Sequence, residues 1–512
     1  MTKKIVTSFH GLKIMQIKMA WLKNGIWALA LAGLYSVILV ILRSPWMYDL
    51  LNDKSVFKSS LIIHVNLSVL VWLLSIVCII WSYSNREIIF AKTFHNLAFV
   101  GMVLMAVSPL LGSSNPVMNN YVPMLENIWF IIGLSLFGTS LLCYAILVLV
   151  DSFASLWQRD FVSVILPIVK ITSALMYVMT WICFFLSYKE LTDLSAIFPM
   201  DVNYYYELLF WSGGHLLQFV YVQIAMFVWI VLLELWFARK LHYYKPYSAL
   251  FVLNFVLGLV CFYGHLVYPI SDYEFKEFFT AHMKYCAGAA PSLFLVVFIM
   301  DAFKNRNKVA DNNLSNNLSN RQIHKIGFIS ASIIASMLLF FAGGGIGTMI
   351  SGTNVSIPAH YHGSIVGISV ALLGFAYVFC FQTSITCFVH MDNHSVSACL
   401  LKPMDNDSSS TMVSDNQETL MEERVLYEKP LLKWAKIQIY VITIGQFLHI
   451  AGLALAGGYG VLRKNPGEEM TGLAKLYMGM VGGGGLVAII GGLMFVYICA
   501  RTVPKIIYSS YE

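Results

Sequence analysis

The sequence predicts an all-α, polytopic membrane protein with twelve transmembrane helices and both termini in the cytoplasm. Of its 512 residues, 58% are hydrophobic and 12% are charged, and the mean hydropathy is +0.71. This composition excludes an ordinary soluble protein. Backbone groups in lipid must be satisfied internally, and long apolar runs achieve this as helices. We therefore expect residues 1–512 to form a single integral membrane domain.

Twelve apolar segments follow one another along the chain, and each is long enough to span a bilayer or nearly so. We expect helices at residues 25–43, 60–83, 94–113, 127–150, 161–188, 207–237, 248–270, 283–302, 325–350, 357–382, 433–459 and 476–500. The stretch before the first segment is too basic for a cleaved signal peptide and reads as a cytoplasmic tail.

The orientation follows from the basic residues. With both termini inside, most of the 33 Lys and Arg residues fall on inner loops, as the positive-inside rule requires. Their place in these loops also explains the net charge of +6, so no nucleic-acid partner is expected. The inner loops at 303–324 and 391–430 are polar, and we expect mobile connectors there. Short loops and basic ends favour a bacterial cell inner membrane.

With this topology, five histidines from four spans share the outer third of the membrane. They are His64 on span two, His215 on span six, His265 on span seven, and His360 and His362 on span ten. Unrelated core histidines have no reason to gather at one depth. His282 and His449 also lie at outer depth, where we expect packing roles. The four glycines at 482–485 are most simply explained by close helix packing.

His360-Tyr361-His362 is the most informative motif, because residues two apart on a helix point about 200° from each other. Its two imidazoles can therefore ligate two different centres. Imidazole is the commonest ligand for haem iron and copper. A haem takes two axial ligands if it only carries electrons, and one if a face stays open for substrate. Five histidines suffice for both kinds of haem and a nearby metal.

At these residues the chain resembles subunit I of the haem–copper oxidase superfamily, over nearly its whole length. The span-ten motif His360-Tyr361-His362 is followed by Gly363, as in the family. His64 in HVNLSVLVWLL is similar to the span-two ligand region of the C-type oxidases and nitric oxide reductases. His215 in FWSGGHLLQFVYVQ resembles the span-six histidine that binds the active-site metal.

The resemblance implies a role for each residue. His64 and His362 would ligate a low-spin haem, and His360 a high-spin haem. His215 and His265 would bind a copper of the CuB kind opposite the second haem. Electrons from a cytochrome c-type subunit or a quinol would then reduce O2 to water with protons from the cytoplasm, in contact with other oxidase subunits and membrane lipid. The chain itself has no Cys-x-x-Cys-His site for a c-type haem.

Three departures from the family pattern bear on the active site. Span seven carries Gly264-His265 in place of the usual His-His, so one metal ligand is missing unless His282 or a water supplies it. Phe219 stands where the family places a Tyr or Glu, four residues after the span-six histidine. Tyr263 matches the span-seven redox tyrosine of C-type oxidases only loosely.

Other functions remain open at this point. A nitric oxide reductase-like enzyme with non-haem iron would fit the sequence of span two. A haem-binding subunit that has lost its active-site metal would fit the missing metal ligand on span seven. A secondary transporter would fit the number of spans, but the chain shows no repeated halves. Intramembrane charges are scarce, and Lys170 and Glu207 are the candidates for proton movement.

Overall fold

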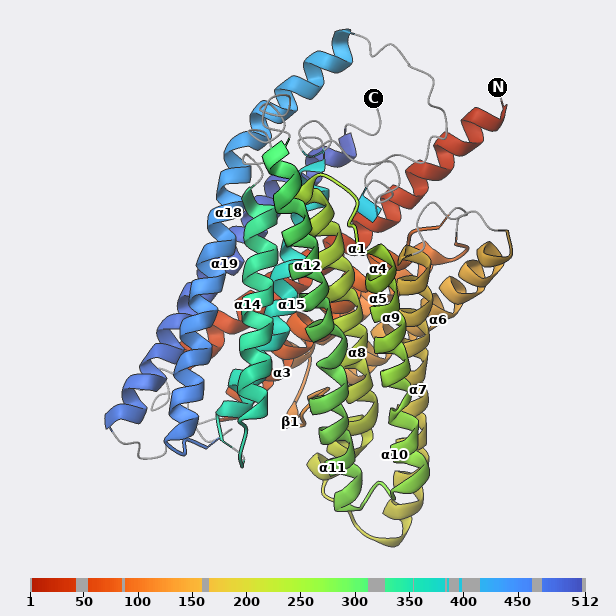
Figure 1. Cartoon of the computed structure of the whole chain (residues 1–512). Helices are drawn as coiled ribbons and strands as arrows, with labels where there is room; N and C mark the ends of the chain where they lie inside the picture. Colours follow the sequence, from red (N-terminus) through yellow and green to blue (C-terminus); the bar gives the residue numbers. More distant parts are fainter. Residues whose placement is uncertain are drawn as a thin grey trace. The chain divides into compact units, whose positions relative to one another are not determined.

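The computed structural model describes residues 2–42, 54–84, 88–158, 165–311, 327–352, 354–382, 385, 396–397, 415–462 and 472–508 (Figure 1). Within these ranges, twelve helices are long and apolar enough to cross a membrane. Each overlaps one of the twelve predicted segments, so the all-α fold class and the number of spans are confirmed. The side of the membrane that the termini face stays a prediction.

The chain divides into two compact units. One comprises residues 16–226 and 244–297, and the other comprises residues 1–15, 227–243 and 298–512. They are called here the first-histidine unit and the span-ten unit, after the ligand candidates they contain. The helices α1 (Thr2–Leu42), α8 (Val202–Phe237) and α12 (Ala289–Asp311) run from one unit into the other.

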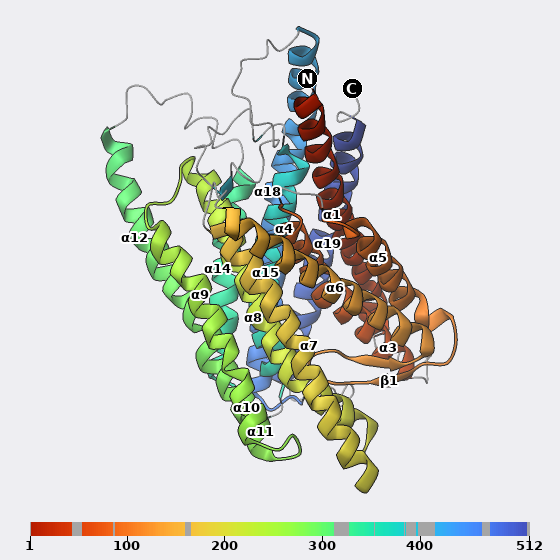
Figure 2. The same ribbon diagram turned by 90° about the vertical axis from the view of Figure 1, so that its right-hand side faces the viewer.

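The first-histidine unit is a helical bundle with one small hairpin of strands. Its span two is built from α3, the π-helix η1 and α4, and its span seven from α9 and α10. Figure 2 shows the strand β1 near the end of α3. The elements that lie wholly within this unit are α3 (Lys54–Val65), η1 (Asn66–Val71), α4 (Trp72–Trp81), α5 (Ala91–Val107), η2 (Ser108–Leu110), β1 (Asn115–Val117), β2 (Met124–Glu126), α6 (Ile128–Gln158), α7 (Ile165–Ile197), α9 (Tyr244–Leu259), α10 (Cys261–Val267), α11 (Tyr273–His282) and η3 (Met283–Ala287).

Buried amides connect the central helices of this unit. The side chain of Gln223 on α8 donates to Thr172 Oγ1 on α7 at 2.6 Å, and Asn254 on α9 donates to Gln223 Oε1 at 2.7 Å. All three side chains are buried. Polar groups away from water are retained when they are hydrogen-bonded, and here they fix the register of three adjacent spans.

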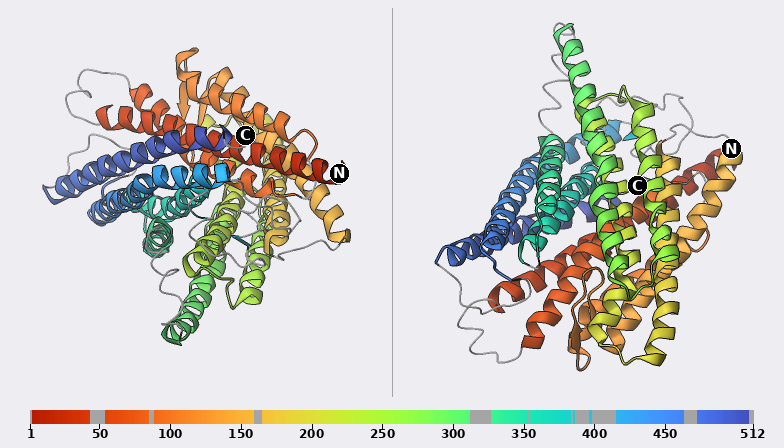
Figure 3. Two further views of the ribbon diagram at one scale, coloured as in Figure 1. Left: turned by 90° about the horizontal axis from the view of Figure 1, so that it is seen from above. Right: turned by 60° about the horizontal axis from the view of Figure 1, so that its bottom comes forward.

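The span-ten unit contains two packed helix pairs. The helices α14 (Gly327–Thr348) and α15 (Ser356–Cys380) form one pair, and α18 (Asp415–Gly458) and α19 (Gly472–Tyr508) form the other. In Figure 3, α18 and α19 are the two blue helices lying side by side. The end of α18 is closed by Gly460, which has φ +77° and whose N–H donates to Gly457 O at 2.9 Å. That left-handed turn is inexpensive for glycine.

Close glycine contacts explain how these pairs pack. A Cβ at Gly363 of α15 would lie 2.5 Å from Cα of Gly343 on α14. A Cβ at Gly484 of α19 would lie 2.5 Å from the backbone N of His449 on α18. A Cβ at Gly482 or Gly483 would meet no atom within 4 Å, so these two glycines do not take part in the close packing predicted for residues 482–485. Gly484 provides the close contact, and Gly485 a looser one, since a Cβ there would lie 3.4 Å from the His449 ring.

The structure describes only parts of the two predicted polar connectors, so their mobility stays a prediction. The helix α12 continues to Asp311 and α18 begins at Asp415, so both ends that face these connectors are helical. Residues 303–311 of the first predicted connector and residues 415–430 of the second are therefore helical. These residues are polar, but they extend a helix that the neighbouring apolar span has already formed. Extending a helix is far less costly than nucleating one. Residues 312–326 and 398–414 lie outside the described residues.

Candidate functional site

The predicted ligands divide between the two units. His64, His215 and His265 belong to the first-histidine unit, and His360 and His362 belong to the span-ten unit. We therefore take each group within its own unit. Which nitrogen of each ring is engaged by the protein decides which nitrogen is left for a metal.

His64 is the last residue but one of α3, and its ring is held by the first span. Its Nδ1 lies 2.9 Å from the carbonyl oxygen of Ala32 and 3.0 Å from Ser36 Oγ, both on α1. A carbonyl oxygen only accepts hydrogen bonds, so Nδ1 carries the proton and donates. Nε2 is then the nitrogen with a free lone pair, which is the arrangement that an axial haem ligand needs.

His360, in the second turn of α15, is fixed in the same way. Its Nδ1 donates to the carbonyl oxygen of Gly343 at 2.8 Å, across the close crossing with α14. A Cβ at Gly347 would lie 2.5 Å from the same Nδ1, so the ring has this position only because residue 347 is glycine. The orientation again leaves Nε2 of His360 for a ligand.

His362 points to another set of neighbours. Its ring packs edge-on against the His449 ring, with centroids 4.8 Å apart and an interplanar angle of 65°. Nδ1 of His449 donates to Val481 O at 2.9 Å, which ties that ring to α19. The packing role expected for His449 is thus carried out against a predicted haem ligand. The different surroundings of His360 and His362 agree with the opposite directions expected from a His-x-His motif.

His215 lies on α8 and is 2% exposed. Its Nδ1 donates to the carbonyl oxygen of Trp211, one turn earlier, at 2.7 Å. Its Nε2 therefore accepts, and the donor is the phenolic hydroxyl of Tyr121 at 2.8 Å. Both nitrogens of this predicted copper ligand are engaged by the protein.

His265 and His282 complete a group of three imidazoles around one phenyl ring. The centroid of buried Phe279 lies 5.6 Å from His215, 5.9 Å from His265 and 6.4 Å from His282. His282 donates through Nε2 to Leu257 O at 2.8 Å. Among the described residues, Nε2 of His265 and Nδ1 of His282 are buried without a hydrogen-bond partner. A buried polar atom without a partner is costly, and a bound ion or water is one explanation for it.

Tyr263 lies apart from these imidazoles. Its side chain is 54% exposed, and its ring contacts Tyr268 and Phe278, with centroids 6.5 and 5.7 Å away. The structure gives no contact between Tyr263 and a histidine of the described chain. Tyr263 and His265 are two residues apart, so their side chains leave the helix on different faces.

The metal-binding capacity of the site is limited by its side chains. In the ranges that the structure describes, no three side chains of His, Cys, Asp and Glu converge as they would around a metal ion. The donor chemistry of His64 and His360 suits haem iron, because each presents one oriented Nε2. The group around Phe279 offers imidazole nitrogens that suit copper, but not three converging ones.

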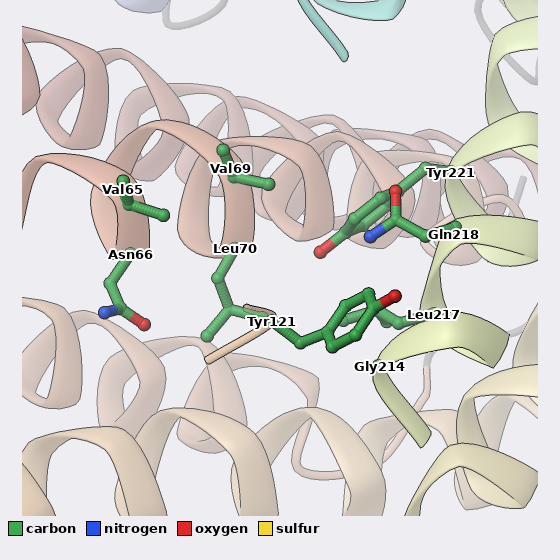
Figure 4. A pocket seen from close by; sticks show the side chains of 9 residues that line it. All are labelled: Val65, Asn66, Val69, Leu70, Tyr121, Gly214, Leu217, Gln218 and Tyr221. Atoms are coloured by element: carbon green, nitrogen blue, oxygen red, sulfur yellow. The ribbon is translucent and has the colours of Figure 1, made fainter. Parts of the chain in front are cut away.

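Tyr121 is the residue that the sequence did not single out. It lies between β1 and β2, in an irregular stretch without apolar periodicity. A Cβ at Gly214 would clash with its ring, so the Gly213-Gly214 pair before His215 was the available signal. Figure 4 shows Tyr121 at one wall of a small cavity of about 10 Å³, opposite Asn66 on η1. That volume suffices for about one water molecule.

Three charged side chains of the spans have partners within the protein, and Glu207 is the one among them that is only half-buried. Lys170 is 6% exposed, forms a 3.6 Å ion pair with Asp151 and donates to the carbonyl oxygen of Tyr83. Glu207 accepts a hydrogen bond from the backbone N–H of Asn120 at 3.0 Å, next to Tyr121. The sequence did not point to Glu234, which is buried on α8 and accepts from the Ser397 N–H at 2.9 Å.

Comparison with known proteins places this arrangement in a family. Residues 16–487 match the model of the family described as cytochrome c and quinol oxidase polypeptide I. The chain belongs to that family. The predicted resemblance to haem–copper oxidase subunit I is thereby confirmed. As a member of the cytochrome c and quinol oxidase polypeptide I family with twelve apolar helices, the chain is a multi-pass membrane protein.

Relatives of this oxidase-family chain include two bacterial proteins without a described function. It is 41% identical to uncharacterized protein RP382 of Rickettsia prowazekii (strain Madrid E), over 94% of this chain and 95% of that protein. It is 25% identical to an uncharacterized protein of Aquifex aeolicus (strain VF5), over 70% of this chain and 84% of that one. A solved haem–copper terminal oxidase dimer is similar with a TM-score of 0.60 and 13% identity, over 97% of this chain and 84% of that chain, which shows the shared fold.

Proposed function

We propose that this chain is the catalytic subunit I of a terminal oxidase, a cytochrome c oxidase-like oxidoreductase that reduces O2 to water in aerobic respiration. The observation that carries the proposal is the orientation of His64 and His360. In each ring a backbone carbonyl accepts from Nδ1 and leaves Nε2 as the one nitrogen for iron. Two separately oriented imidazoles at the ends of two spans suit two haems.

The residues have distinct roles in this proposal. His64 and His362 hold the low-spin haem, His360 holds the high-spin haem, and His215 and His265 hold copper. When bound, these groups supply electron transfer and a place where O2 is reduced. The carbonyl oxygens of Ala32 and Gly343 keep the imidazoles oriented.

Protons and electrons must reach this site from outside the described chain. We propose that protons enter from the cytoplasmic side, with Lys170 and Glu207 as candidates for their movement. Electrons come from a cytochrome c-type subunit or a membrane quinol, and the chain assembles with other oxidase subunits in a bacterial inner membrane. These partners rest on the family membership.

The optical spectrum of the purified protein tests the proposal. We expect the dithionite-reduced minus oxidised spectrum to reveal two haems, one of which binds carbon monoxide. We also expect O2 uptake that cyanide inhibits and that His215→Ala abolishes. The absence of a haem signal would contradict the proposal, as would O2 uptake that neither cyanide nor His215→Ala reduces.

A second candidate is a haem-binding subunit that has lost the active-site metal. The position of Phe279 favours it, because this buried ring contacts all three imidazoles of the group. Phe219 adds to this, since its ring stacks on His282 at 4.9 Å where the family places an oxygen-bearing side chain. Elemental analysis separates the candidates: two haems without non-haem metal favour the second, and extra iron in place of copper favours a nitric oxide reductase-like enzyme.

A further inference from the structure

Each unit contains one pair of buried cysteines whose sulfur atoms meet between two helices. In the first-histidine unit, Sγ of Cys183 on α7 lies 3.9 Å from Sγ of Cys261 on α10. In the span-ten unit, Sγ of Cys380 on α15 lies 3.8 Å from Sγ of Cys499 on α19. All four side chains are at most 1% exposed. Sulfur atoms in a disulfide are about 2 Å apart, so each pair would have to close by about 2 Å to form one.

The helix α10 is held against α7 at two levels. Cys261 is the first residue of α10 and contacts Cys183. Beyond the other end of α10, the backbone N–H of Ile270 donates to Glu190 Oε1 on α7 at 2.7 Å. Cys183 and Glu190 are seven residues apart, or about two turns, so they lie on one face of α7. Because these contacts bracket α10, the two thiols meet between helices that are already held together.

The two cysteine pairs belong to spans that end on different sides of the membrane. Cys183 and Cys261 lie in the second halves of spans five and seven. Cys380 ends span ten, and Cys499 lies near the end of span twelve. Odd and even spans end on opposite sides of a bilayer. With the predicted cytoplasmic termini, spans five and seven end outside, where disulfides persist, and spans ten and twelve end in the cytoplasm, where thiols stay reduced.

We propose that Cys183 and Cys261 form a disulfide bond that ties span seven to span five, while Cys380 and Cys499 remain thiols. His265 is four residues after Cys261 on the same short helix, so the bond also fixes the helix that carries this imidazole. A metal ion is less suited to these two sulfurs, because two thiolates would bring charge into buried apolar surroundings, whereas a disulfide is neutral. The bond is independent of the haems and of the proposed oxidase activity.

The disulfide has to form before the helices close over the two sulfurs. During insertion of the chain, the Cys183 thiolate attacks a disulfide of an oxidising protein outside the membrane, and a mixed disulfide forms. The Cys261 thiolate then attacks Cys183 Sγ, which forms the new S–S bond and releases the oxidant as a dithiol. Two electrons and two protons thus pass from the two cysteines to the oxidant. Burial of both side chains then protects the bond from reductants.

Peptide mapping of the full-length protein tests this bond. Bacterial cells that express the chain are lysed directly into denaturant with N-ethylmaleimide, which blocks every free thiol, and the protein is digested without reductant. We expect a peptide that joins Cys183 to Cys261 and that disappears on reduction. Cys380 and Cys499 are the matched control, because their sulfurs are as close and as buried, and we expect N-ethylmaleimide on both. N-ethylmaleimide on Cys183 and Cys261 in most molecules would overturn the proposal.

Thermal unfolding of the protein in detergent gives a second measurement. We expect Cys183→Ala and Cys261→Ala each to lower Tm, and the double variant to lower it little further, because either single change removes the whole bond. Reductant should lower the wild-type Tm and leave that of the double variant unchanged. Additive losses, together with a wild-type Tm that reductant does not change, would show that the bond is absent. Neither measurement involves haem or O2, so the proposed function stands or falls separately.

Discussion

Nδ1 of His360 donates a 2.8 Å hydrogen bond to the carbonyl oxygen of Gly343, at the point where α14 and α15 cross most closely. The bond forms because glycines let two backbones approach, and a carbonyl of one helix then reaches the imidazole of the other. Helix packing and ligand orientation are therefore the same interaction at this residue.

Gly347→Ala is expected to displace the His360 ring, because the added Cβ would lie 2.5 Å from Nδ1. We expect loss of most of the haem that binds carbon monoxide, with the low-spin haem retained, and destabilisation of about 1–3 kcal/mol. The carbon monoxide difference spectrum measures this. Gly344→Ala is the control, since no atom lies within 4 Å of its added Cβ, and equal spectra of the two variants would argue against the role of Gly347.

His64→Ala is expected to remove the low-spin haem, because no other imidazole in that span can replace the oriented Nε2. The haem that binds carbon monoxide should remain. Haem quantification and the reduced-minus-oxidised spectrum check the result. His95→Ala serves as the comparison, since the His95 ring instead packs against Trp21 with centroids 4.9 Å apart. A full low-spin signal in His64→Ala would rule out His64 as the ligand.

Gly484→Leu is expected to force α18 and α19 apart, since its Cβ would lie 2.5 Å from the His449 backbone N. Overpacking of this kind costs about 1–3 kcal/mol. Because His449 contacts His362, we also expect a shift in the low-spin haem spectrum. Thermal unfolding in detergent and the optical spectrum measure the two effects. Gly483→Leu faces open space and should leave both unchanged.

Asp151→Asn is expected to destabilise the first-histidine unit, because it leaves the buried charge of Lys170 without its carboxylate. Removing one partner of a buried ion pair typically costs about 3–5 kcal/mol. Thermal unfolding of Asp151→Asn, Lys170→Met and the double variant forms a double-mutant cycle. We expect the double variant to recover part of the loss, and strictly additive effects would show that the pair is not coupled.

The spans could be predicted from the sequence because lipid imposes one solution on apolar runs, and all twelve predicted segments are helical spans. The histidines of spans two, six, seven and ten stood out because imidazole is rare and costly there. Tyr121 could not be found in this way. It is one of 27 tyrosines, and its contact with His215 exists only in the folded chain.

The helix ends were less predictable than the helices. Composition predicts where polar chain begins, but α12 and α18 extend into polar sequence because an apolar span has already nucleated each helix.

The π-helix η1 begins two residues after His64, and it has a consequence for how span two tolerates change. A π turn contains an extra residue relative to the α-helix around it. Each residue turns an α-helix by about 100°, so deleting one residue from Asn66–Val71 would rotate the segment that carries His64 against the rest of its own span. This stretch should therefore accept side-chain replacements more readily than a change in its length. We therefore expect relatives that bind a haem here to differ in the residue types of η1 but to keep the same number of residues in it.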